Sequence, residues 1–341
     1  MALEVGTDAL KPYSHRFSPK KFTQPQLFAC LVLKAFYKTD YRGIAAILAD
    51  NSDLRQTLGI ETVPHFTTIQ KAGQRLLRNA PAQALLDQTI RHARPRAKRT
   101  ARRRSVKRTT LDASGFEARH VSHYFMKRRA KGGKAWQNTT YKRFPKLGIL
   151  CDCQTHMILA AVPCRGPSPD ITHFESAVGQ ALRRAKLETL YADAGYDAEW
   201  VHEVSRERHG VRTIIPPLIG RPTGKAPKGH WRKVMSERLH LTNYGQRWQV
   251  ETVNSMIKRR QGSAVSATTY WSQCRALMLK AITHNILILY APTQLMNAAL
   301  DMGFLRSIPY PFYPFTPDME LQCDTPAALK SALRGLIREL R

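Results

Sequence analysis

The chain has 341 residues, 43% of them hydrophobic, which suffices for one large and one smaller domain and excludes a wholly disordered protein. Lysine and arginine number 54 against 25 aspartates and glutamates, a net charge of +29 that indicates a polyanionic partner. Charge alone leaves nucleic acid and an acidic membrane surface open, although no apolar run approaches the roughly 20 residues that span a bilayer.

The first part of the chain predicts a helical domain. Residues 1–23 are polar and interrupted by prolines, so we expect a flexible lead-in there. From residue 24 to residue 93 apolar residues recur at helical spacing, as Leu27, Leu31 and Ala35 do. Prolines interrupt this pattern, which indicates several short helices rather than one long helix.

A basic linker is predicted at residues 94–108, which contain nine lysines and arginines and no acidic residue. Such a block is typical of a solvated, flexible connection. A connection of this charge also binds phosphate groups, so both interpretations stand. We expect Arg102, Arg103 and Arg104 to contact a nucleic acid backbone.

From residue 109 onward, short apolar runs indicate strands that alternate with helices. The order β-β-β-α-β-α-β-α predicts an α/β fold with a mixed five-stranded sheet flanked by helices. The predicted strands cover residues 109–112, 190–193 and 211–216, with a hairpin over 147–162, and the predicted helices cover 174–187, 199–208, 242–260 and 271–290.

Two loop-like basic segments interrupt this part of the chain. Residues 217–240 form a short basic insertion, in which Trp231 has two interpretations: stacking on an unpaired base or ordinary packing. The other segment spans residues 119–146 and adds to the phosphate-binding surface. After the last long helix, residues 293–341 form a proline-rich tail that ends in a short basic helix. Within residues 119–146, we expect Lys127, Arg128 and Arg129 to contact DNA.

Three cysteines and one aspartate in this part resemble metal ligands. The spacing of Cys151, Cys153 and Cys164 lacks the paired C-x2-C pattern of structural zinc sites. Alternation along a strand explains the first two as packing residues. Asp170 precedes a predicted helix, where an N-cap explains it better than a metal ligand.

Two other aspartates end predicted strands. Asp112 is followed by Ala-Ser-Gly, and Asp193 is followed by Ala-Gly. Ligands gather at the carboxyl ends of strands in sheets of this type, and small residues after each aspartate leave room for a metal and a phosphate. Turn chemistry explains one such aspartate, so the pair is the more informative observation.

A polar stripe follows one face of the predicted helix 242–260. Its members are 3, 4 and 7 residues apart, so at about 100° per residue they fall within an arc of roughly 60°. A solvated face with an ordinary ion pair explains such a stripe equally well when it is taken alone. The polar stripe consists of Tyr244, Arg247, Glu251 and Lys258.

The polar stripe matches a known signature, Y-x2-R-x3-E-x6-K, at every fixed position. The chain thereby resembles the DDE transposases of bacterial insertion sequences, in the type-four and type-five groups. The residues around Asp112 and Asp193 resemble the two Asp motifs of that family. The resemblance covers about residues 20–292. It implies an RNase H-like catalytic domain over residues 109–292, preceded at residues 24–93 by a small all-helical domain for DNA binding or dimerisation.

The same resemblance implies a metal-dependent enzyme. Asp112, Asp193 and Glu251 would be the catalytic residues and would hold two divalent cations, Mg²⁺ or Mn²⁺, with Asp112 bridging them. Two such ions activate a nucleophile and stabilise the leaving oxygen of a phosphodiester. The other members of the polar stripe would bind DNA near the scissile bond. No organic cofactor is expected.

The partner implied is double-stranded DNA, as the terminal inverted repeats of a transposon and as a target. The protein would be an endonuclease that also rejoins strands in DNA transposition and recombination, in the cytoplasm at the nucleoid. A homodimer in a synaptic complex is expected, because two transposon ends must meet. No membrane partner is expected. Two alternatives stay open: a catalytically idle, domesticated DNA-binding protein, and an RNase H-like nuclease without strand transfer.

Overall fold

The computed structural model describes residues 1–13, 17, 21–93, 105–118, 143–217 and 227–300. Residues 1–286 form one compact unit, and residues 287–341 belong to a second unit. Within the described ranges no helix is long and apolar enough to cross a membrane. Three sequence predictions lie outside these ranges: the DNA contacts of Arg102–Arg104, those of Lys127–Arg129, and the short helix of the tail.

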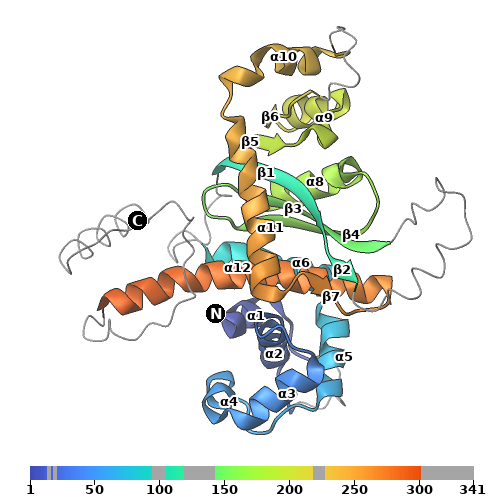
Figure 1. The fold of residues 1–341 in the computed structure, drawn as a ribbon. Coiled ribbons are helices and arrows are strands. Elements are labelled where there is room, and N and C mark those ends of the chain that lie inside the picture. The colour runs from blue at the N-terminus through green and yellow to red at the C-terminus, as the bar shows by residue number, and fades with distance from the viewer. Residues whose placement is uncertain (14–16, 18–20, 94–104, 119–142, 218–226, 301–341) are drawn as a thin grey trace, which may run out of the picture. The chain divides into compact units, whose positions relative to one another are not determined.

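Short helices fill the chain up to residue 92 (Figure 1). The flexible lead-in expected over residues 1–23 is wrong in part, because α1 forms there and packs against α2 and α6 with Val5 fully buried. A helix of 8 residues shows too little periodicity to be recognised without its packing partners. These helices are α1 (Ala2–Ala9), α2 (Gln24–Phe36), α3 (Tyr41–Asp50), α4 (Ser52–Leu58), α5 (Phe66–Leu76) and α6 (Asn79–His92).

The described strands form the predicted mixed five-stranded sheet, in the order β4-β3-β1-β5-β6. Strand β1 pairs antiparallel with β3 and parallel with β5; β3–β4 is antiparallel and β5–β6 is parallel. This confirms the RNase H-like arrangement. The strands are β1 (Ser105–Gly115), β3 (Phe144–Asp152), β4 (Ile158–Gly166), β5 (Lys186–Ala192) and β6 (Arg212–Ile214); the short β2 (Glu117–Ala118) and β7 (Ala264–Val265) pair with each other.

Helices flank the sheet. Helix α8 contacts β3, β4 and β5, and α11 contacts β1 and β3, crossing in front of the sheet in Figure 1. The helices are α8 (Phe174–Arg184), α9 (Glu199–Glu203) with the π-helical turn Val204–Arg208, α10 (His230–Arg238), α11 (Trp248–Gln261) and α12 (Tyr270–Leu300), and the 3-10 turns are η2 (Asp170–His173), η3 (Ala194–Tyr196), η5 (Leu239–Leu241) and η6 (Tyr244–Arg247).

Several segments differ from their predictions. Strand β1 begins at Ser105, inside the expected basic linker, and continues past Asp112 to Gly115, because residues on both sides of the predicted strand pair with β5 and β3. Asp112 therefore lies within its strand rather than at the end. Helix α12 continues to Leu300, beyond the predicted end at residue 290.

Residues 217–240, expected to be a loop, contain α10, whose only buried side chain is Met235, so it lacks an apolar stripe. The helix expected from residue 242 begins instead as the 3-10 turn η6. Gly245 lies inside that turn, and glycine disfavours the α-helix.

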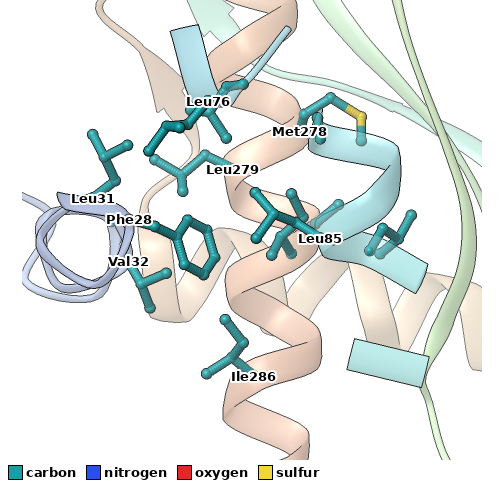
Figure 2. Close-up of a cluster of buried hydrophobic side chains, with 14 of the residues drawn as sticks. Phe28, Leu31, Val32, Leu76, Leu85, Met278, Leu279 and Ile286 are labelled. Atoms are coloured by element: carbon teal, nitrogen blue, oxygen red, sulfur yellow. The ribbon is translucent and has the colours of Figure 1, made fainter. Parts of the chain in front are cut away.

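One hydrophobic core joins the early helices, the sheet and the last two helices of the first unit. Figure 2 shows Phe28 of α2 and Leu85 of α6 beside Leu279 of α12. On the sheet, Leu147 and Ile149 alternate along β3 and join the same cluster as the buried side of α11. Residues 24–93 therefore share a core with the sheet, while their role in DNA binding or dimerisation stays a prediction.

Buried hydrogen bonds tie the early helices to β4. Asn285 of α12 accepts the N–H of Ile158 at 2.8 Å and donates to the carbonyl oxygen of the same residue at 2.9 Å. The Asn285 amide also donates to Thr89 Oγ1 of α6 at 3.0 Å. Arg184 of α8 donates to the carbonyl of Leu159 at 2.8 Å and to Gln83 Oε1 at 2.5 Å. These contacts fix α6, α8 and α12 on one strand.

Candidate active site

Asp112 lies within β1, and Asp193 follows directly after the neighbouring parallel strand β5. Leu111 of β1 pairs with Ala192 at the end of β5, so the aspartates that follow occupy corresponding positions. On its other side Asp112 pairs with Ile149 of β3. Paired residues point to the same face of a sheet, so the Asp112 side chain lies on the face that packs against α11. The sequence alone predicted the aspartates but not this register.

A tight turn orients the Asp193 carboxylate. Its Oδ1 accepts the N–H of Gly195 at 2.9 Å, which makes Asp193 the N-cap of η3. A Cβ atom at Gly195 would lie 3.0 Å from the same oxygen, closer than ordinary packing allows. The small residue predicted to keep the site open therefore also lets the turn close against the carboxylate.

The site holds excess negative charge. The pKa of Asp112 is raised to about 6, chiefly by burial; the backbone hydrogen bond of Ala113 opposes the shift, and the carboxylates of Asp193 and Asp170 add to it. A cation placed between such carboxylates would relieve this repulsion. Carboxylate oxygens are the ligands that Mg²⁺ and Mn²⁺ prefer, so the donor set fits a divalent cation.

Glu251 lies in the first turn of α11 and is held by an ion pair. Arg247 Nη2 donates to Glu251 Oε1 at 2.6 Å, and the glutamate side chain is 54% exposed. No three His, Cys, Asp or Glu side chains in the described ranges are grouped closely enough to hold a metal ion. The fold thus brings Asp112 and Asp193 together and places Glu251 on the facing helix, without forming a closed metal site.

The start of α11 is attached to the strands that it covers. Thr110 Oγ1 of β1 donates to the carbonyl oxygen of Arg247 at 3.2 Å, two residues before Asp112. His156 Nε2, after β3, lies 2.7 Å from Gln249 Oε1 of α11. The first turn of α11, which carries Glu251, is therefore tied to the strand that carries Asp112.

The polar stripe bends at its beginning. Tyr244 and Arg247 lie in η6, where residues three apart share a face, so they stay aligned although the turn is not α-helical. Tyr244 packs against Cys153 and Tyr191, and burial, Asp193 and Glu251 raise its pKa while Arg247 lowers it. Three members of the polar stripe thus lie at the acidic site.

Lys258, the last member of the polar stripe, lies two turns further along α11. Its ammonium nitrogen is 5.4 Å from the centre of the buried Phe116 ring, after β1. Seven residues of α-helix separate it from Glu251 by about 10 Å. This placement suits a phosphate next to the acidic site rather than at its centre.

Trp231 is half-buried and takes part in attaching α10 to α9. The guanidinium of Arg206 lies 4.4 Å from the centre of its ring, and its Nε1 donates to Glu207 at 3.0 Å. Glu199 accepts the backbone N–H groups of Trp231 at 2.8 Å and Arg232 at 3.1 Å. The structure therefore gives Trp231 a packing contact, and stacking on a DNA base stays a prediction.

Asp170 is not an N-cap, because Pro169 occupies that position and makes no side-chain cap. Its carboxylate forms an ion pair with Lys146 of β3, whose ammonium group also donates to the carbonyl oxygen of Ser168 at 2.8 Å. No spacing in the sequence connects residue 146 with residue 170, so sequence reasoning missed this pair.

The described cysteines are free, and the three considered as zinc ligands are buried, in keeping with a packing role.

The chain was compared with known proteins. None of the curated proteins matches it. The family described as transposase DDE domain matches residues 67–286, a span that includes the whole sheet, both aspartates and the polar stripe.

Proposed function

Because the chain belongs to the family of transposase DDE domains, we propose that it cleaves the ends of a transposon and joins them to target DNA. DDE transposases generally use divalent metals and act on DNA. The observation that carries the proposal is the register of β1 and β5. It sets Asp112 beside the end of β5, where Asp193 follows, on the face that packs against α11, the helix that carries Glu251.

The three carboxylates would hold Mg²⁺ or Mn²⁺, two ions per site, with Asp112 and Asp193 binding from the sheet and Glu251 from α11. When bound, such ions supply Lewis acidity for the attacking and leaving oxygens of a phosphodiester. The protein's own part is to keep two carboxylates close together despite their repulsion, which the register and the Gly195 turn do. The raised pKa of Asp112, caused by burial and by its acidic neighbours, fits this role.

The basic members of the polar stripe would bind and orient the DNA. A guanidinium has five N–H donors, so Arg247 can bind a phosphate while it holds Glu251. Lys258 would bind a phosphate about two helical turns away, and Tyr244 would pack against the sugar. The net charge of +29 supplies attraction for the rest of the duplex.

The test is an end-cleavage assay on DNA that carries the flanking inverted repeats, with Mn²⁺. Asp112→Asn should abolish cleavage and keep end binding, whereas Asp50→Asn, at an exposed site on α3, should behave as wild type. Cleavage by Asp112→Asn would overturn the metal assignment. Cleavage without joining by the wild type would favour the nuclease alternative, and binding without cleavage would favour the idle DNA-binding protein.

The active form would be a homodimer that holds two transposon ends together. Because its substrate is DNA, the protein would act at the nucleoid. Mass photometry of the full chain with one repeat and with paired repeats checks the homodimer. A 2:2 complex that forms only with repeat DNA is expected. A monomer that cuts both ends at wild-type rate would contradict the synaptic arrangement.

A further inference from the structure

The hydroxyl of Tyr196 is a buried polar group for which the proposed reaction has no use. Tyr196 closes η3, three residues after Asp193, and its backbone N–H donates to the Asp193 carbonyl at 3.1 Å. Its side chain is 0% exposed, and its hydroxyl has no hydrogen-bond partner in the described part of the chain. A buried hydroxyl without a partner destabilises a fold, so a partner is to be expected.

Three carboxylates are the charged groups that act most strongly on this hydroxyl. Burial raises the pKa of Tyr196 far above its usual value, and Asp170, Asp112 and Asp193, in that order, raise it further. Each of these groups, when ionised, accepts hydrogen bonds and donates none. The turns η2 and η3, which carry Asp170 and Tyr196, also pack against each other. The hydroxyl is therefore a donor placed among acceptors.

Asp170 is fixed on its other side by Lys146. That lysine lies on β3 opposite Gly115 of β1, three residues after Asp112, which brings the ion pair to the border of the acidic site. Both side chains are mostly buried, at 12% exposed for Lys146 and 21% for Asp170. Three carboxylates and one ammonium leave two negative charges without compensation, which suits one divalent cation.

We propose that Tyr196 and Lys146 hold Asp170 as a fourth acidic group of the site, whose charge strengthens cation binding by Asp112 and Asp193. When a cation is bound, the Tyr196 hydroxyl, which has no partner in the described structure, donates a hydrogen bond to the Asp170 carboxylate. Asp170 acts beside the cation rather than as a ligand, because its carboxylate is already paired with the Lys146 ammonium group. Tyr196 is a positioning residue. The inference rests on the proposed function, since it requires a cation at the two aspartates.

The test measures Mn²⁺ binding by the full chain without DNA, by calorimetry and by the shift of the melting temperature. Asp170→Asn should weaken Mn²⁺ binding about tenfold, and Tyr196→Phe by a few fold, as for groups that support metal ligands. Metal-free Tyr196→Phe should melt no lower than the wild type, because the removed hydroxyl has no partner in the described structure. A purely structural tyrosine would instead lower the melting temperature and leave Mn²⁺ affinity unchanged.

Matched controls are Asp50→Asn and Tyr37→Phe, both at exposed positions on other elements. The inference would be overturned if Asp170→Asn and Tyr196→Phe both bind Mn²⁺ like the wild type and Asp112→Asn loses binding. If Asp112→Asn also binds like the wild type, the proposed function itself fails. Should Asp170→Asn not fold, Tyr196→Phe decides the question alone, since it keeps the ring and its packing against Phe174.

Discussion

Arg247 and Glu251 form an ion pair across the junction of η6 and α11, with 2.6 Å between Nη2 and Oε1. Their side chains are 25% and 54% exposed, so solvent screens the attraction and the pair stabilises the fold by only about 0.3–0.5 kcal/mol. Its main consequence is orientation: the guanidinium of Arg247 holds the Glu251 carboxylate at the start of α11.

Arg247→Ala should therefore separate stability from activity. We expect the free energy of unfolding to change by less than about 0.5 kcal/mol, because the pair is exposed. Cleavage should fall about tenfold or more, because the proposed charge-assisted contact of Arg247 with DNA and the orientation of Glu251 would be lost together. Urea unfolding and the end-cleavage assay measure the two effects. Arg247→Lys keeps the positive charge but loses the forked N–H donors of the guanidinium, so its cleavage rate should lie between those of the wild type and Arg247→Ala. Full cleavage activity in both variants would contradict the role assigned to Arg247.

Asp112→Asn should stabilise the metal-free protein at neutral pH. The pKa of Asp112 is raised from 3.8 to about 6 in the folded state, mainly by burial. The native state then binds the proton more tightly than the unfolded state, so stability falls as pH rises from about 4 to about 6 and stays low above that. Asparagine removes this cost, which reaches about 3 kcal/mol at most. Unfolding of both proteins in EDTA between pH 4 and pH 8 checks the prediction, and parallel curves would contradict it.

His202 should make the fold less stable as the pH falls, the opposite of the effect expected for Asp112. It is fully buried, with Nδ1 at 2.7 Å from Thr213 Oγ1, and its pKa is lowered to about 4, mainly by burial, with Arg206 contributing. The unfolded chain protonates this histidine near pH 6.5 and the native state does not, so its contribution is complete above that pH. Up to about 3 kcal/mol should be lost as pH falls from 6.5 to 4. His202→Gln should flatten that part of the stability profile; an unchanged slope would show that other groups cause it.

Glu199→Ala should release α10. The Glu199 carboxylate accepts two backbone N–H groups in the first turn of α10, as an N-cap does, and losing a cap costs about 1 kcal/mol. Gly229→Ala should act similarly, because a Cβ atom there would lie 2.1 Å from Glu199 Oε2 on a backbone with φ of +98°. Hydrogen exchange over residues 230–238 should accelerate in both variants. The control is Glu203→Ala, on α9 like Glu199, for which hydrogen exchange over residues 230–238 should not change.

The sequence was sufficient to predict an element of the fold where its local residue pattern agrees with its burial in the structure. Asp193 does follow the end of its strand, as the apolar run before small residues predicted, whereas β1 continues past Asp112 to Gly115 because β3 pairs with it there. The mixed sheet followed from the order of the apolar runs. Helix α10 was missed because a distant glutamate and Trp231 stabilise it rather than an apolar stripe. The ion pair of Lys146 and Asp170 was missed because it depends on how η2 folds back over β3, which no periodicity encodes. Glu251 was found by its motif, and its ion pair with Arg247 is one that a solvated helix face would also form.

The shared core has a consequence for how this chain is synthesised. Leu277, Met278 and Ile282 of α12 are buried with Phe28 and Leu85, which the ribosome releases some 200 residues earlier. A nascent chain or a truncated product that ends before residue 277 would contain every carboxylate of the site and still lack one wall of its core. Translation must therefore pass this helix before the nuclease fold can close, and shorter fragments would be substrates for proteolysis rather than enzymes that cut DNA.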